Sequence, residues 1–177
     1  MSTVIPEGTW TSDKTHSTFG FSARHLVVAT YRGTLLDFDA TVVGNPDGSC
    51  QLDAAARVAS VSTTDENLTG HLLAPDFFDA QRFPEVRYHA TEISRDGDHL
   101  IVSGQLSLKG VTKDIVLHGE IAGPTVGFED REILGITLEG TIDRTEFGIT
   151  WNATLPTGGL VLGHEVKLVA NLELARA

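Results

Sequence analysis

The sequence predicts an all-β protein, an antiparallel barrel or sandwich of about eight strands with one short helical insertion. Two observations support this prediction. Apolar and polar residues alternate with a period of two in successive segments of the 177-residue chain, as they do in strands with one buried face. Turn-forming residues separate most of these segments, which favours antiparallel pairing of neighbours. No linker or repeat interrupts residues 1–177, so we expect a single domain.

The first two strands are expected at residues 10–13 and 16–26. In the second strand apolar side chains alternate with polar ones, and His25 has the same parity as the phenylalanines. Strand geometry therefore predicts that its imidazole faces the side that holds Phe19 and Phe21. An apolar enclosure that contains one polar group is the minimal description of a small-molecule site.

An antiparallel hairpin is expected next. Its first strand places a row from Leu36 through Phe38 to Val42 on one face, and residues 45–48 have the composition of a tight turn. The returning strand begins at Cys50, the only cysteine of the chain. A lone cysteine excludes an internal disulfide, and its place in an apolar row favours a small buried side chain.

The alternation then breaks, and a short helical insertion is expected near residues 63–80. Ser62 or Thr63 can cap its first helix. A second short helical turn carries Phe77 and Phe78. Two adjacent phenylalanines on so short an element need a partner surface, which the mouth of a barrel provides.

Five further strands are expected after the insertion. Each shows an apolar row with the period of a strand, and turns separate them. The rows begin at Val86, Leu100, Ile115, Leu134 and Val166.

Small residues occupy many positions in the apolar rows. The interior of an eight-stranded barrel is either filled by side chains or holds one ligand, depending on side-chain size. Small residues leave it under-filled, which favours a long apolar ligand, because each buried CH₂ group contributes ~0.8 kcal/mol. In the alternative, a flattened sandwich, small residues let two sheets approach. The positions are Ala23, Ala40, Ala54, Ala56, Ala90, Gly104, Gly119, Gly140 and Ala170.

The net charge argues against several classes of partner. With 13 basic and 24 acidic residues the chain has a formal charge of -11, which repels phosphate backbones and anionic headgroups. We therefore expect no nucleic-acid partner and no peripheral membrane docking. No apolar run approaches the about 20 residues of a membrane span. The first residues lack an export signal, so a cytoplasmic location is expected.

Catalytic and metal-binding motifs are absent from the sequence. It contains no G-x-S-x-G, H-E-x-x-H, C-x-x-C or phosphate-binding glycine loop, so no catalytic residue, metal site or cofactor is expected. Asp37 and Asp39 share a strand face, but it is opposite to that of Phe38, which favours solvated carboxylates over an acid/base pair.

Several short motifs occur in a set order along nearly the whole chain. They include Phe-x-x-Arg-His-Leu at 21–26, Ser-Val-Ser-Thr at 60–63, Pro-Asp-Phe-Phe-Asp at 75–79, Gly-Val-Thr-Lys at 110–113 and Asp-Arg at 143–144. Together these motifs resemble the YceI-like family. The resemblance implies an extended eight-stranded antiparallel β-barrel, lipocalin-like, whose apolar interior holds a polyisoprenoid or a related long-chain amphiphile.

The resemblance also implies which residues contact the ligand and what the protein does with it. We expect binding, transport or storage of a long-chain isoprenoid, quinone or fatty amphiphile without catalysis. Dimers are common in that family, so a homodimer is an expectation as well. The ligand-binding residues expected on this basis are Phe19, Phe21, His25, Phe38, Leu72, Phe77, Phe78 and Leu106.

Three residues leave alternatives open. An enzyme, such as an isomerase, cyclase or hydrolase, could use the same cavity with His25 as its acid/base group. His25 could equally be a core histidine bonded to a backbone carbonyl. We interpret Asp143 and Arg144 as a structural pair at a strand end rather than as substrate-binding groups.

Overall fold

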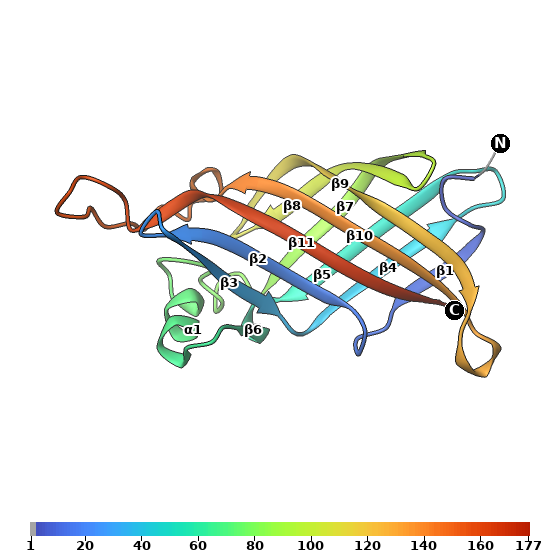
Figure 1. Cartoon of the computed structure of the whole chain (residues 1–177), viewed down its shortest axis with the longest axis horizontal. Coiled ribbons are helices and arrows are strands. Elements are labelled where there is room, and N and C mark those ends of the chain that lie inside the picture. Colours follow the sequence, from blue (N-terminus) through green and yellow to red (C-terminus); the bar gives the residue numbers. More distant parts are fainter. Residues whose placement is uncertain (1–2) are drawn as a thin grey trace.

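The structure is a closed antiparallel β-barrel with a short α-helix beside it, seen in a computed structural model that describes residues 3–177 (Figure 1). The hydrogen-bonded order is β1-β4-β5-β7-β8-β9-β10-β11, and β1 pairs again with β11 to close the ring. The eight-stranded barrel is therefore confirmed, and the flattened sandwich is wrong. The elements are β1 (Gly8–Ser12), β2 (Thr18–His25), β3 (Ala29–Leu35), β4 (Phe38–Gly44), β5 (Cys50–Arg57), β6 (Val61–Ser62), α1 (Glu66–Leu73), β7 (Glu85–Asp96), β8 (His99–Leu108), β9 (Val111–Val126), β10 (Glu132–Asp143) and β11 (Leu162–Arg176).

Three barrel strands are broken into two pieces each. β1 and β2 follow one another beside β11, which pairs with β2 at residues 162–171 and with β1 at residues 174–176. β3 and β4 make the next strand, and β5 and β6 the third, because β4 pairs with β5 while β3 pairs with β6. The breaks let the barrel continue past β1, β4 and β5, which gives it the elongated shape in Figure 1.

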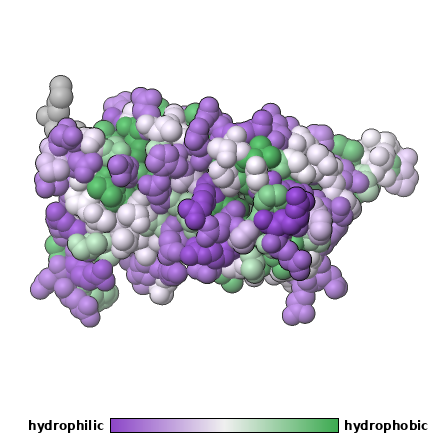
Figure 2. All heavy atoms as spheres, turned by 180° about the vertical axis from the view of Figure 1, so that it is seen from behind, coloured by the Kyte–Doolittle hydropathy of each residue, from purple (hydrophilic) through white to green (hydrophobic). Residues whose placement is uncertain are grey.

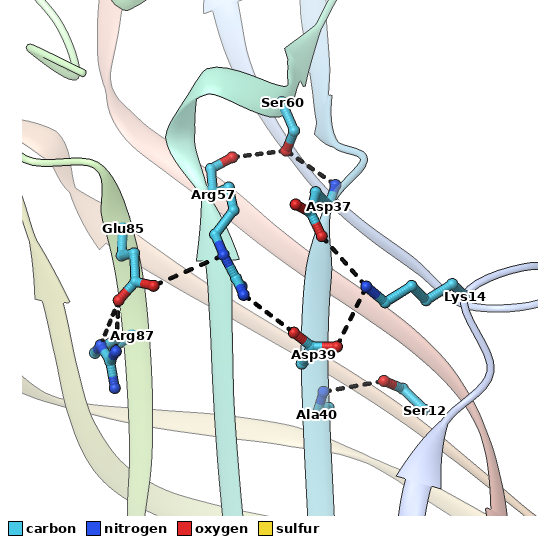
Figure 3. A network of polar contacts seen from close by, with 9 residues as sticks. All are labelled: Ser12, Lys14, Asp37, Asp39, Ala40, Arg57, Ser60, Glu85 and Arg87. Carbon is cyan, nitrogen blue, oxygen red and sulfur yellow. Dashed lines mark hydrogen bonds and ion pairs between the residues drawn. The ribbon is translucent and has the colours of Figure 1, made fainter. Parts of the chain in front are cut away.

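Ser60 joins the two neighbouring breaks (Figure 3). Its carbonyl accepts a hydrogen bond from the backbone N–H of Leu36 at 3.2 Å, and its Oγ accepts one from that of Asp37 at 2.9 Å. The same hydroxyl donates to the carbonyl of Arg57 at 2.6 Å. At this bend Leu36 is 66% exposed, so the prediction that it shares the inward face of Phe38 is wrong.

The outer face of β4 carries exposed ion pairs (Figure 3). Lys14 Nζ lies 3.3 Å from Asp37 Oδ1 and 3.4 Å from Asp39 Oδ1, and an Nη2 of Arg57 lies 3.3 Å from Asp39 Oδ2. Both aspartates lie opposite the buried Phe38, as predicted. Exposed pairs of this kind contribute only about 0–1 kcal/mol to stability, so they serve mainly to keep this face polar.

Residues 13–17 leave the sheet between β1 and β2, and Ser17 supplies hydrogen bonds to β11 there. Its Oγ accepts from the backbone N–H of Glu173 at 3.0 Å and donates to the carbonyl of Glu173 at 3.2 Å. The N–H of Asp13 donates to the same carbonyl at 2.8 Å. A buried serine thus replaces the ladder where the strand is interrupted.

Side chains fill the end of the barrel that contains β1. Trp10 is fully buried, its indole N–H donates to the carbonyl of Pro6 at 3.0 Å, and it pairs with the fully buried Val42 of β4. Leu134 and Leu174, which pair with each other across β10 and β11, are also fully buried. This end is a packed core.

The glycines of the apolar rows allow close packing and leave no space. A Cβ at Gly119 would lie 1.6 Å from the carbonyl oxygen of Thr137 on the next strand. A Cβ at Gly104 would lie 2.5 Å from the carbonyl oxygen of His89 and 2.7 Å from the ring of Tyr88. These positions therefore require glycine. Of the small residues in the apolar rows, only the alanines leave space inside the barrel.

The insertion after β6 is less helical than predicted. Asp65 is the N-cap of α1, with its Oδ1 accepting from the N–H of Leu68 at 3.0 Å, so the expectation of a Ser62 or Thr63 cap is wrong. Residues 75–78 form hydrogen-bonded turns and not a second helix. Across residues 3–177, no helix has the length and apolar character to cross a membrane.

Candidate functional site

Two adjoining apolar cavities lie inside the barrel. Their volumes are about 70 Å³ and about 80 Å³. Since one water-sized group needs roughly 10–15 Å³ of such space, together they have room for about ten CH₂-sized groups. The cavities adjoin because four side chains line both of them, namely Phe19, Val86, Leu106 and Leu168.

Alanines make the space of the first cavity. Ala40, Ala54, Ala56 and Ala170 line it from β4, β5 and β11. Their methyl groups leave the barrel axis open where larger side chains would fill it. Tyr88 also lines this cavity, but its hydroxyl donates to the carbonyl of Val102 at 3.1 Å. The first cavity is therefore suited to a purely apolar chain.

Aromatic side chains and one unpaired hydroxyl line the second cavity. The ring of Phe21 meets Tyr31 and Phe78 edge to face, with centroids 6.3 and 5.8 Å apart. The Tyr31 Oη is buried and has no hydrogen-bond partner within residues 3–177. Burial raises the pKa of Tyr31 to about 12, so the phenol keeps its proton at neutral pH. A buried phenol can both donate and accept a hydrogen bond, which provides one polar contact in an apolar enclosure.

Seven of the eight predicted ligand-binding residues lie on the walls of these cavities. Whether they touch a ligand stays a prediction. Phe38 lines the first cavity, Phe21, Leu72, Phe77 and Phe78 line the second, and Phe19 and Leu106 line both.

His25 lies elsewhere, and the prediction that its imidazole faces the interior is wrong. It is exposed at the end of β2, where it pairs with Leu162 of β11. The register shift between Leu162 and Val166 lies on β11, and β2 pairs regularly with β3 up to His25, so His25 keeps the parity of the phenylalanines but is exposed because it is the last residue of β2, at the barrel rim. The core-histidine alternative is also wrong, and the enzyme hypothesis loses its acid/base group.

A cluster of aromatic rings joins the two segments that lie over the second cavity. His71 of α1 meets Phe77 and Trp151 edge to face, with centroids 4.7 and 5.2 Å apart. Trp151 comes from the loop at residues 148–161, so the cluster links this loop to the insertion. Sequence reasoning missed both Trp151 and Tyr31, although an aromatic residue in a Gly/Thr-rich loop and one at strand parity were available signals.

Arg144 anchors both ends of the same loop. Its side chain is 3% exposed and lines the second cavity. Its Nε donates to the carbonyl of Gly163 at 2.8 Å, and its Nη atoms donate to those of Ile149, Trp151 and Leu162 at 2.8, 2.9 and 3.1 Å. Burial lowers the pKa of Arg144 from its ordinary value.

Asp143 does not form the expected ion pair with Arg144 in the described part of the chain. Its Oδ1 accepts instead from the backbone N–H of Thr145 at 2.9 Å and from the Thr145 hydroxyl. These hydrogen bonds hold the pKa of Asp143 below its ordinary value. Each residue bonds to backbone groups, and the interpretation that both are structural rather than substrate-binding stays a prediction.

One group of potential metal ligands was not predicted from the sequence. Asp13, His16 and Glu173 place one ligand atom each within 4.8 Å of one another. Their contacts are those of an ion-pair cluster, with His16 Nδ1 3.0 Å from Asp13 Oδ2 and 3.7 Å from Glu173 Oε1. The carboxylates raise the pKa of His16, chiefly through the Asp13 hydrogen bond. The sequence offered no signal, because the fold alone brings Glu173 to this turn.

This geometry resembles that of known proteins at the level of sequence and of fold. A family model described as a YceI-like domain matches residues 10–174. A UPF0312 protein of Staphylococcus aureus (strain USA300) is 31% identical over 169 residues, which cover 94% of this chain and 96% of the relative.

Solved structures show the same barrel. The Campylobacter jejuni YCEI protein is 28% identical with a TM-score of 0.74, covering 87% of this chain and 90% of that one. Burkholderia cenocepacia BcnA superposes with a TM-score of 0.79 at 19% identity, over 92% of this chain and 98% of that one. A polyisoprenoid binding domain from Saccharophagus degradans superposes with a TM-score of 0.65 at 12% identity, over 97% of this chain and 100% of that one. The last two likenesses concern the fold alone.

Proposed function

Because the chain belongs to the YceI-like domain family, we propose that its barrel binds a polyisoprenoid or another long-chain amphiphilic lipid, and that it carries or stores this lipid without catalysis. The observation that carries the proposal is the pair of adjoining apolar cavities along the barrel interior. The Saccharophagus degradans domain with the same fold is a polyisoprenoid binding domain, which agrees with this ligand class. The cytoplasmic location and the homodimer stay predictions.

The different linings of the two cavities determine the orientation of the ligand in the barrel. Its apolar chain occupies the alanine-lined cavity beside the packed Trp10 end, and its polar end lies in the second cavity with Tyr31. About ten buried CH₂ groups contribute roughly 8 kcal/mol before the cost of ordering the chain. A single hydrogen bond adds about 1 kcal/mol, so the chain determines the affinity and the head determines the orientation.

Titration with prenol, geraniol and farnesol, which have one, two and three isoprene units, tests the proposal. We expect Kd to fall with each added isoprene unit until the cavities are full, because each unit buries more CH₂ groups. Isothermal calorimetry measures this series directly, with a negative heat-capacity change as the sign of apolar burial. Equal, weak binding of all three alcohols would contradict an interior site.

Tyr31→Phe is expected to weaken binding of a ligand with a hydrogen-bonding head by about fivefold, since it removes a contact worth about 1 kcal/mol. Because Tyr31 Oη has no hydrogen-bond partner within residues 3–177, this change is expected to leave the free energy of unfolding the same or higher. Tyr88→Phe is the matched control, because the Tyr88 hydroxyl already bonds to a carbonyl. The proposed role of Tyr31 is contradicted if Tyr31→Phe and Tyr88→Phe bind farnesol with equal affinity. It is also contradicted if Tyr31→Phe weakens the binding of farnesane, which lacks the hydroxyl head, as much as that of farnesol.

A further inference from the structure

Two loops at one end of the barrel expose a set of apolar side chains. The β2–β3 turn and the loop at residues 148–161 both project from the left end in Figure 1. They are joined by a hydrogen bond from the N–H of Leu26 to the carbonyl of Val161 at 2.8 Å. We call this surface the apolar tip, and its exposed large side chains are Leu26, Val27, Val28 and Leu160, which are 37, 64, 80 and 40% exposed.

The β2–β3 turn that carries three of these side chains has a strained backbone. Its two central residues, Leu26 and Val27, have φ values of 52° and 64°, and Val28 closes the turn by donating to the carbonyl of His25 at 3.2 Å. Positive φ at both central residues is the requirement of a type I′ turn, which Asn-Gly meets without strain. A leucine and a β-branched valine are strained there and are also exposed to water. The stability of the fold therefore does not explain why Leu26 and Val27 occupy this turn.

The charge around the apolar tip differs from that of the whole chain. Residues 18–36 and 147–163 contain no Asp or Glu, although the chain has 24. Arg24 and Arg32 are exposed on β2 and β3 beside the turn. In Figure 2, where this end lies on the right, the projecting loop is drawn mostly in pale colours. The acidic residues that give the chain its net charge of -11 thus lie outside these two segments.

We propose that the apolar tip docks on a phospholipid bilayer, with the aliphatic side chains entering the interface and the two arginines contacting lipid phosphates. The tip also lies next to the second cavity, because Leu162, which lines that cavity, pairs with His25 at the base of the turn. Docking would therefore place the cavity beside the lipid from which a ligand enters. This goes beyond the proposed function, and binding to the bilayer itself does not depend on a cavity ligand.

Flotation of the full chain with phosphatidylcholine vesicles tests this surface. The test variant combines Leu26→Asn, Val27→Gly and Val28→Ser, which gives the turn its preferred residues, so we expect an equal or higher melting temperature. Its partition into vesicles should fall about tenfold or more, because the apolar side chains are gone. Arg32→Gln should weaken partition by a smaller factor.

Two controls separate this proposal from others. Phe128→Ser removes a side chain that is 96% exposed in the β9–β10 loop at the opposite end, where Glu129 and Asp130 adjoin it, and it should leave partition unchanged. Ala170→Phe, which blocks the first cavity, should also still float, so failure of ligand binding and failure of docking are distinguishable. The proposal is overturned if the wild-type chain does not float with the vesicles, or if the turn variant floats as well as the wild type.

Discussion

Arg144→Met is expected to lower the free energy of unfolding by about 4 kcal/mol, because it removes the donor to four backbone carbonyls at once. Methionine preserves much of the apolar volume but cannot donate a hydrogen bond. The carbonyls of Ile149 and Trp151, at the start of the loop, and of Gly163, after it, then lose this partner. A loss of this size is a large share of the 5–15 kcal/mol that stabilises a typical domain.

Urea unfolding followed by circular dichroism measures this effect. Arg87→Met is the matched control, since Arg87 is exposed and pairs only with Glu85 among the described residues, and its removal should change stability by less than about 1 kcal/mol. Arg144→Lys keeps the charge but loses the planar fork of donors, so we expect it to recover only part of the loss. Equal stability of Arg144→Met and Arg87→Met would show that the four hydrogen bonds do not hold the loop.

Ala170→Phe is expected to weaken farnesol binding by about a hundredfold. Ala170 lines the first cavity, and a phenyl ring there displaces about four CH₂ groups of the ligand, or ~3 kcal/mol of apolar burial. Part of the ring fills existing space, so the overpacking cost in stability stays within about 1–3 kcal/mol. Calorimetric titration gives the affinity, and urea unfolding gives the stability of the same preparation.

Asn171→Phe is the control for this variant. Asn171 is the next residue of β11, it is exposed, and its side chain lies on the other face of the strand. The same ring is thus placed outside the barrel, and farnesol binding should stay within about twofold of the wild type. Equal affinities of the two variants would place the ligand outside the barrel interior.

The barrel itself was predictable because strand periodicity is a local property. Every second side chain of such a strand is buried. The apolar row from Phe38 to Val42 and the returning strand from Cys50 could therefore be predicted from the sequence alone. The phenylalanines of β2 could be assigned to the interior for the same reason, whereas those of the insertion were assigned to the barrel mouth because two adjacent rings on a short element need a partner surface.

The predictions that were wrong lie where a strand breaks or ends. Leu36 follows the end of β3, where Ser60 bends the chain, and one extra residue there moves the next side chain to the other face. His25 keeps its parity but is the last residue of β2, so its imidazole lies at the barrel rim and is exposed. Tyr31 was overlooked because β3 was not recognised as a strand, and the contact of His16 with Glu173 depends on pairing of the two chain ends.

The most direct measurement of the central claim is mass spectrometry of the organic extract of the denatured, purified protein. If the adjoining cavities hold a lipid, the extract of the wild-type chain should contain a long-chain amphiphile in near-stoichiometric amount, and that of Ala170→Phe should contain much less. An empty wild-type protein that also fails to bind farnesol, a quinone or a fatty acid would contradict a lipid-binding barrel.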